Sequence, residues 1–318
     1  MRPRAHTRRD PLPSQRPKPA EDNHSAPDRV RAILKSPSYL EADQDVEFLD
    51  RSEVRGLRLQ LDYAKAELLL EEHDIRSTIV VLGSTRILEP AAARRRVEAL
   101  RAALTDDPAN PELVRRLAVA ERILAKSHYY DMAREFARLV SAGSPELPEY
   151  RPAIVTGGGP GIMEAANRGA DDVHAKSIGL NITLAHEQYP NPYITADLCF
   201  RFHYFAVRKM HLLLRATALV AFPGGYGTLD ELFETLDLVQ SGKLAPLPLV
   251  LVGEGYWRRV LDMQFLLDEG VIEREDLESF WFAETAQEIW DGIVHWHTLN
   301  SSLRADLSIA SPAGRQSV

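Results

Sequence analysis

The stretch FPGGYGTLDELFE, from Phe222 to Glu234, decides how this chain folds. A short apolar run of strand type, Ala216 to Phe222, comes directly before it. Apolar residues at helical spacing come after it, namely Leu229, Leu232, Phe233 and Leu236. The stretch from Pro223 to Thr228 is therefore predicted to be a glycine-rich turn between a buried strand and a helix.

This turn has the features of an anion-binding site. Its three glycines allow the backbone to take positive φ and let a ligand approach the main chain closely. Thr228 is expected to be the N-cap of the helix, with Asp230 and Glu231 in the first turn. Unpaired N–H groups and the positive end of the helix dipole favour an anion there. We expect a phosphate group to bind to Gly224, Gly225, Tyr226, Gly227 and Thr228.

The two acids at the start of the helix, Asp230 and Glu231, indicate chemistry on the bound ligand. A phosphate site by itself needs no carboxylate. In a nucleotide the next reactive centre is C1′ of the sugar, whose bond to the base breaks through an oxocarbenium-like state. A carboxylate stabilises that state and orients a water molecule. The alternative is a loop that only packs, with acids that interact favourably with the helix dipole.

Two further motifs precede the turn in the chain. The run GGGPGIM, Gly157 to Met163, follows a predicted strand at Ala153 to Thr156. The pair Arg208-Lys209 lies on a predicted helix, Tyr204 to Arg215. Adjacent side chains diverge by about 100° on a helix, so one cation can enter a pocket while the other pairs outside it. The alternative for this pair is a surface salt bridge.

These three motifs, in this order, resemble those of the LOG family, and PGGYGTLDE matches its signature P-G-G-x-G-T-x-x-E. The family comprises cytokinin riboside 5′-monophosphate phosphoribohydrolases and related nucleotide nucleosidases, formerly labelled lysine decarboxylases. The resemblance extends from about Ser77 to His297. It implies that Arg208 and Glu231 are the catalytic pair and that Glu187 contacts the substrate.

Other residues are expected to complete the pocket. The backbone after the strand at Ala153 to Thr156 would form a second wall, and Glu164 would reach the ribose or serve the helix dipole. Ser84 follows the predicted strand Thr78 to Leu82, at the end where open α/β sheets bind ligands. Arg86 in the same turn would meet a phosphate or pair with an acid. The expected substrate contacts outside the signature turn are Lys209, Gly157, Gly158, Gly159, Glu164, Glu187 and Ser84.

Composition limits the classes of function. The chain of 318 residues has a formal net charge of −8, and a general nucleic-acid-binding protein would show a basic face instead. Cys199 is the only cysteine, which excludes an intramolecular disulfide and favours a reducing cytoplasm. The histidines lack the tight spacing of metal ligands, so we expect no catalytic metal and no cofactor. No apolar run approaches the roughly 18 residues of a membrane span, so we expect no membrane partner.

The order of elements predicts an α/β fold. Strands and helices alternate from Thr78 onward, which indicates a Rossmann-like parallel sheet with helices on both faces. We expect a disordered tail at 1–36, a helical extension at 37–76, the main domain at 77–299 and a loose tail at 300–318. A helix at Leu40 to Glu72 would place an apolar face, Val54 to Leu68, against the main domain or a second subunit. The helix Pro111 to Ala125 resembles an insertion, and one helix is expected at Tyr256 to Leu267.

The leading hypothesis is hydrolysis of the N-glycosidic bond of a purine nucleoside 5′-monophosphate, either AMP or an N6-modified AMP. The resemblance also implies a homodimer or larger homo-oligomer. The main alternative is a non-catalytic nucleotide carrier or sensor, although simple binding requires no Glu231. A dinucleotide oxidoreductase is disfavoured because the glycines do not follow G-x-G-x-x-G. Lysine decarboxylation is disfavoured because no lysine motif for pyridoxal phosphate is visible.

Overall fold

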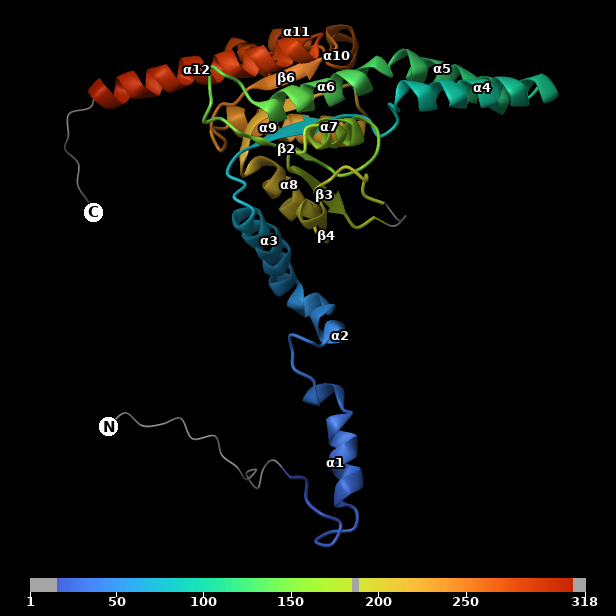
Figure 1. The fold of residues 1–318 in the computed structure, drawn as a ribbon, viewed down its shortest axis with the longest axis vertical. Coiled ribbons are helices and arrows are strands. Elements are labelled where there is room, and N and C mark those ends of the chain that lie inside the picture. The colour runs from blue at the N-terminus through green and yellow to red at the C-terminus, as the bar shows by residue number, and fades with distance from the viewer. Residues whose placement is uncertain (1–15, 185–188, 311–318) are drawn as a thin grey trace. The chain divides into compact units, whose positions relative to one another are not determined.

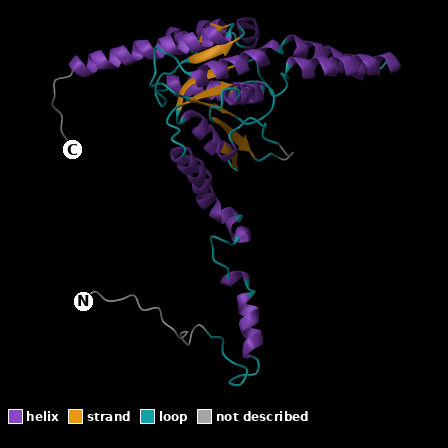
Figure 2. Ribbon diagram, viewed as in Figure 1, coloured by secondary structure: helices purple, strands orange, loops and turns teal. Residues whose placement is uncertain are grey.

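The computed structural model describes residues 16–184 and 189–310, and these contain a seven-stranded sheet (Figure 1, Figure 2). Every neighbouring pair is parallel, in the order β4-β3-β2-β1-β5-β6-β7. The strands are β1 Thr78–Leu82, β2 Ala153–Thr156, β3 Ser177–Ile182, β4 Cys199–Phe202, β5 Ala216–Ala221, β6 Leu249–Val252 and β7 Trp281–Ala283. The predicted α/β fold with a Rossmann-like parallel sheet is confirmed.

The strand order reverses between β1 and β5. The chain runs outward from β1 through β2 and β3 to β4, and then returns to the other side of β1 as β5. Thr78 of β1 consequently pairs with Ala153 on one side and with Ala216 on the other. Open α/β sheets bind ligands outside the carboxyl ends of their strands at such a reversal. The fold therefore favours a ligand site after Leu82 and Ala221.

Helices cover both faces of the sheet. They are α4 Pro90–Asp106, α5 Pro111–Ala125, α6 His128–Ala142, α7 Ile162–Asp171, α8 Phe205–Leu213, α9 Tyr226–Gln240, α10 Glu254–Val260, α11 Met263–Asp268 and α12 Ala286–Ala310. All five residues of β1 are buried, although successive side chains of a strand point to opposite faces. Ile79 and Val81 join a core that includes side chains of α6, α7 and α12, while Val80 and Leu82 are buried on the opposite face. Burial on both faces explains why the strands are continuous apolar runs.

A helical hairpin of α4 and α5 lies in the connection between β1 and β2 (Figure 1). Both helices have proline in the first turn, and Asn110 caps α5 by accepting from the N–H groups of Glu112 and Leu113 at 3.1 and 3.2 Å. The hairpin has a small core of its own, formed by Val97, Leu100 and Ala120 with Leu113, Leu117 and Leu124 packed against them. The predicted helix at Pro111 to Ala125 is confirmed with the same bounds.

The amino-terminal unit, Met1–Leu61, is distinct from the unit Asp62–Val318. Its described part contains α1 Ala26–Leu34, α2 Val46–Leu49 and the beginning of α3 Arg55–Glu72. Among its described residues only Ala26 is buried, so little hydrophobic stabilisation arises from packing inside this unit.

The helix expected at Leu40 to Glu72 is interrupted. Asp45 caps the short helix α2 by accepting from the N–H of Phe48 at 2.9 Å. Arg51 then adopts an extended conformation, with φ −63° and ψ 146°, before α3 begins. Leu68, on the apolar face predicted for this segment, is 57% exposed within the single chain, whereas Ala66 and Leu70 are buried, so packing of that face against a second subunit stays a prediction.

Other helix ends differ from the prediction as well. Helix α1 lies inside the segment 1–36 that composition predicted to be disordered, and α12 continues to Ala310, past the expected end at Leu299. The single helix predicted at Tyr256 to Leu267 is wrong. Asp262 separates α10 from α11, because its carboxylate caps α11 by accepting from the N–H of Phe265 at 3.0 Å. Within the described chain, no helix has the length and apolar character to cross a membrane.

Candidate functional site

A cavity of about 540 Å³ lies where the strand order reverses, a volume typical of small-molecule sites. It is lined by the end of β1 and the turn after it (residues 82–86), Gly157 after β2, Met163 of α7, two side chains of α8 and the beginning of α9. The sequence places polar or glycine-rich turns after three strands, and the parallel sheet brings those turns together.

Most of the predicted site residues lie on this cavity. Those that line it are Ser84, Gly157, Arg208, Gly225, Tyr226, Gly227, Thr228 and Glu231. Those that the structure places elsewhere are Gly224, Lys209, Gly158, Gly159 and Glu164. Glu187, predicted to contact substrate, is outside the residues that the structure describes.

The signature turn differs from the expectation in its backbone. Helix α9 begins at Tyr226, and Gly225 is its N-cap, with φ −101°. The prediction that Thr228 caps the helix is wrong, since Thr228 is already helical and is buried. The positive φ that the glycines of this turn allow does not occur, because Gly224, Gly225 and Gly227 all lie outside the left-handed region.

Steric contact explains why position 224 of the turn is a glycine. A Cβ on Gly224 would lie 2.0 Å from Oγ1 of Thr228, so a larger residue cannot stand there while Thr228 keeps its place. The hydroxyl of Tyr256 donates to the carbonyl of Gly224 and fixes the turn from α10. Gly225 and Gly227, by contrast, have no atom near their Cβ positions, which leaves open space on the cavity side.

Arg208 and Glu231 form an ion pair inside the cavity, from α8 and α9. Nη1 of Arg208 donates to Oε1 of Glu231 at 3.2 Å, and the two side chains are 14% and 9% exposed. Nε of Arg208 also donates to the carbonyl of Leu180 at 2.7 Å, which ties the guanidinium to β3. The charged fork is thus held in one orientation against both the sheet and the carboxylate.

Burial raises the pKa of Glu231 to about 7. The positive charges of Arg208 and Lys209 oppose this shift, while Glu234 and Asp230 add to it. Burial likewise lowers the pKa of Arg208, although an arginine remains charged. A carboxyl group with a pKa near neutrality exchanges protons readily at physiological pH, as acid–base catalysis requires.

Lys209 takes a separate role. Its ammonium group pairs with Asp230 at 3.0 Å and with Glu234 at 2.8 Å. The divergence of adjacent helical side chains explains why Arg208 enters the cavity and Lys209 instead ties α8 to α9. Lys209 therefore does not line the cavity, whereas the predicted substrate contact would require it to do so.

The second glycine motif, Gly157 to Met163, leaves space for the side chain of Arg208. A Cβ on Gly157 would lie 2.6 Å from Nη2 of Arg208 and 2.9 Å from Sδ of Met163, so only glycine leaves room for the guanidinium. Positive φ occurs in this motif, at Gly158 (73°) and Gly161 (74°). Positive φ, which glycine allows in both turns, is thus used here and not in the signature turn.

A buried amide network holds this glycine loop and was missed in the sequence. Nδ2 of Asn191 donates to the carbonyl of Gly159 at 3.1 Å and to Oδ1 of Asn167 at 2.9 Å. The hydroxyl of Thr156 donates to the same Oδ1 at 2.8 Å and accepts from the N–H of Gly158 at 2.9 Å. These residues are distant in sequence and belong to no motif, so only the fold reveals the network.

Glu164 does not reach the cavity. Its carboxylate accepts a hydrogen bond of 2.7 Å from the hydroxyl of Tyr130 on α6. Burial raises the pKa of Tyr130 above its ordinary value, and the neighbouring Glu164 adds to the shift. This contact joins α6 to α7, which makes Glu164 a structural partner in this conformation.

The cavity is also lined by Asp230, the second acid that the sequence indicated, and by residues that were not expected to contact the ligand, namely Leu82, Gly83, Thr85, Met163 and Phe205. Phe205 lies three residues before Arg208, nearly one helical turn away, so periodicity would have placed both on one face of α8. Met163 belongs to the glycine motif. Arg86, for which ligand contact or ion pairing was expected, lines the cavity. Among residues 16–184 and 189–310, no group of three potential metal ligands occurs.

Comparison with known proteins agrees with the motifs. The family model described as "Possible lysine decarboxylase" matches residues 163–293, which include Arg208 and Glu231. A cytokinin riboside 5′-monophosphate phosphoribohydrolase of the LOG type from Arabidopsis thaliana is 25% identical over 186 residues, 56% of this chain and 75% of that protein. These similarities confirm the predicted resemblance to the LOG family.

Other matches are shorter or structural. A rice (Oryza sativa subsp. japonica) protein named "Probable cytokinin riboside 5′-monophosphate phosphoribohydrolase" is 36% identical over 86 residues. That match spans 26% of this chain but only 40% of the rice protein. A solved molybdenum cofactor binding protein from Rippkaea orientalis aligns over 72% of this chain and 99% of its own, with 18% identity and a TM-score of 0.38. The fold assignment rests on the sheet itself and not on that alignment.

We predict that Gly161→Ala is strongly destabilising. Gly161 has φ 74°, and an added Cβ would lie 2.4 Å from the carbonyl oxygen of Ser84. Backbone strain of about 1–3 kcal/mol is then joined by a clash that moves the Ser84 turn. Urea unfolding measures the loss. Gly242→Ala is the matched control, because Gly242 has φ 71° with no atom near the added Cβ, and an equal loss in both variants would contradict the clash.

We also predict that Glu231 destabilises the folded protein at alkaline pH. Its raised pKa means that the folded state holds a proton between about pH 4.5 and 7 that the unfolded state has released. Stability is therefore lost as the pH rises through this window, by an amount on the order of 3 kcal/mol. Glu231→Gln should remove this loss, so its stability relative to wild type should be greater at pH 8 than at pH 4.5. Urea unfolding at both values checks this, and a difference independent of pH would refute it.

Proposed function

We propose that this protein hydrolyses the N-glycosidic bond of purine nucleoside 5′-monophosphates, releasing the free base and ribose 5-phosphate. The observation that carries the proposal is the buried pair of Arg208 and Glu231 beside the glycine turn that begins α9. Relatives named as cytokinin riboside 5′-monophosphate phosphoribohydrolases support the same reaction class.

The phosphate of the nucleotide would bind at the beginning of α9. Tyr226 and Gly227 are the first residues of this helix, so their N–H groups have no carbonyl partner within it. The open space beside Gly225 and Gly227 lets an anion approach the main chain. The helix dipole adds positive potential at the same point.

Glu231 would act on the ribose. In its ionised form the carboxylate orients a water molecule towards C1′ and offsets the positive charge that develops as the bond to the base breaks. The water forms the new C–O bond, and the electron pair of the broken bond leaves with the base, which gains a proton. Arg208, fixed to Leu180 and Glu231, holds the carboxylate in place for this role.

The base would be adenine or an N6-modified adenine. The two substrates share the phosphate and ribose that the Arg208 and Glu231 end of the cavity would recognise, and they differ only at the exocyclic nitrogen. An apolar contact for an added group there is worth about 1–3 kcal/mol, which gives a preference and not exclusivity. The names of the plant relatives favour the N6-modified substrate.

We predict that Glu231→Gln and Arg208→Ala each reduce kcat/KM by about 10²- to 10⁴-fold, since each removes part of the positioned acid–base machinery. The assay is chromatographic release of free base from AMP and from isopentenyl-AMP. In wild type, kcat/KM should rise with pH through an apparent pKa of about 7 and then level off, because Glu231 must be ionised. The Glu231→Gln variant should lose this rise.

Asp268→Asn provides the control, since Asp268 ends α11 and is absent from the cavity lining. Wild-type turnover by either Glu231→Gln or Arg208→Ala would refute the catalytic assignment. Nucleotide binding by the wild-type protein without release of base would favour the carrier or sensor function instead.

We further propose that the active form is a homo-oligomer. Two aromatic side chains that line the cavity are exposed, Tyr226 at 93% and Phe205 of α8, and Met210 of the same helix is exposed as well. Their burial in a subunit interface would stabilise association. Light scattering after size exclusion should give at least twice the chain mass of 35.7 kDa. Tyr226→Ser should shift the protein towards monomer, and a monomeric mass for wild type at all concentrations would refute the proposal.

A further inference from the structure

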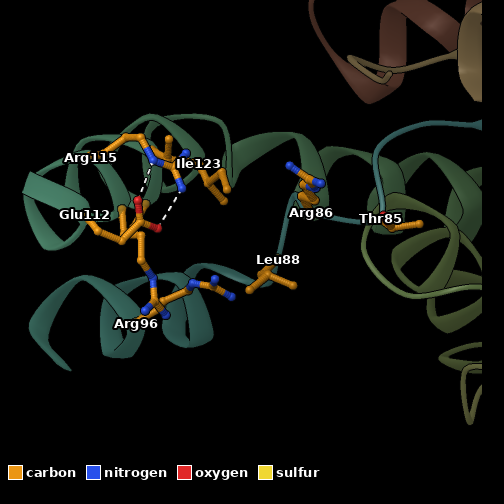
Figure 3. Close-up of a pocket in the computed structure, with 10 residues that line it drawn as sticks. Thr85, Arg86, Leu88, Arg96, Glu112, Arg115 and Ile123 are labelled. Carbon is orange, nitrogen blue, oxygen red and sulfur yellow. Dashed lines mark hydrogen bonds and ion pairs between the residues drawn. The ribbon is translucent and has the colours of Figure 1, made fainter. Parts of the chain in front are cut away.

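A second cavity, of about 450 Å³, lies between the α4–α5 hairpin and the turn after β1 (Figure 3). The residues that line it are Thr85, Arg86, Leu88, Arg96, Glu112, Arg115, Arg116, Val119, Ala120 and Ile123. Figure 3 shows Arg96 on α4 and Arg115 on α5 at the hairpin, with Arg86 on the chain that leads from β1. The proposed hydrolysis gives this cavity no role.

The charge of this lining is unusual for the protein. Four arginines and one glutamate leave it with a formal charge of +3, whereas the whole chain carries −8. Positive charge is therefore concentrated in one cavity of an acidic protein. A concentration of positive charge in a cavity focuses the local electric field and attracts a small anion.

Only one of these arginines is held by a carboxylate. Arg115 forms a two-pronged pair with Glu112, with N–O distances of 2.8 and 2.7 Å. For Arg86, Arg96 and Arg116, no side-chain hydrogen bond or ion pair is found within residues 16–184 and 189–310. Glu112 thus holds one guanidinium by hydrogen bonds, and although its charge also acts on Arg116, the guanidinium donors of Arg116, Arg86 and Arg96 stay available to a ligand.

Three guanidinium groups from three separate elements suit a ligand with several anionic oxygens. Arg86 comes from the turn after β1, Arg96 from α4 and Arg116 from α5. Each guanidinium presents a planar fork that binds two phosphate oxygens at once. Two linked phosphates offer each fork its own pair of terminal oxygens, whereas a single phosphate must share its oxygens among the three forks.

We infer that this cavity, lined by Arg86, Arg96 and Arg116 between the hairpin and the β1 turn, is a binding site for a ligand with two or more linked phosphate groups. It adjoins the nucleotide cavity, because Thr85 and Arg86 line both. It is nevertheless separate, since Arg96 and Arg116 line only the second cavity. The apolar side chains of Leu88, Val119 and Ile123 leave room for a non-polar portion of the ligand.

Isothermal titration of the full chain with sodium pyrophosphate at low ionic strength tests the inference. We expect binding that persists in saturating AMP, that is weaker for orthophosphate and that falls as salt is added. Arg96→Ala and Arg116→Ala should each weaken pyrophosphate binding by about tenfold or more, because each removes a charge-assisted contact. Both side chains are exposed, so the thermal unfolding midpoint should stay close to that of wild type.

Arg95→Ala is the matched control. Arg95 is the exposed neighbour of Arg96 on α4, carries the same charge and does not line the cavity. It should change the affinity by less than about twofold, because only screened, distant charge is lost. The inference is overturned if pyrophosphate does not bind, if AMP abolishes binding, or if Arg95→Ala weakens binding as much as Arg96→Ala. Because binding is the readout, its failure is distinguishable from failure of the hydrolase proposal.

Discussion

The ion pair between Arg208 and Glu231 is the constraint around which the site is built. Taking a carboxylate and a guanidinium out of water is costly, and their attraction repays this only with good geometry and further hydrogen bonds. The carbonyl of Leu180 supplies such a bond to Arg208, and the missing side chain of Gly157 supplies the space. Part of the free-energy cost of burying the charges remains at Glu231, because its pKa stays raised despite the adjacent positive charge.

The parallel sheet explains how such a pair can be assembled. Arg208 and Glu231 lie on consecutive helices that flank β5, and β5 lies beside β1 at the strand reversal. Lys209 ties these two helices together from outside the cavity through Asp230 and Glu234. Arg208 therefore lies inside the site, whereas the adjacent Lys209 holds together α8 and α9, the two helices that carry the ion pair.

The sequence predicted the sheet and most of the cavity lining because both depend on local patterns. Apolar strands and glycine turns are short-range signals, so β2 and α5 were placed with their final bounds. Backbone conformation was less predictable. The glycines of the signature turn allow positive φ, but it occurs at Gly158 and Gly161, where the neighbouring strand and turn leave no space for a side chain. The amide network of Asn167 and Asn191 depends on contacts between distant segments and carries no local signal.

The position of Glu231 shows a conflict between stability and chemistry. A glutamate on the exposed face of α9 would keep an ordinary pKa and would cost the fold nothing, but it would also be solvated and poorly placed to order a single water. The buried position raises its pKa to about 7, so the group remains partly protonated at neutral pH. Strain of this kind persists where it serves function, because selection removes only those residues that take stability below the needed threshold. Replacement of a purely structural buried ion pair by packed apolar residues is often neutral or stabilising, so a destabilising carboxylate on the cavity lining is an argument for a chemical use.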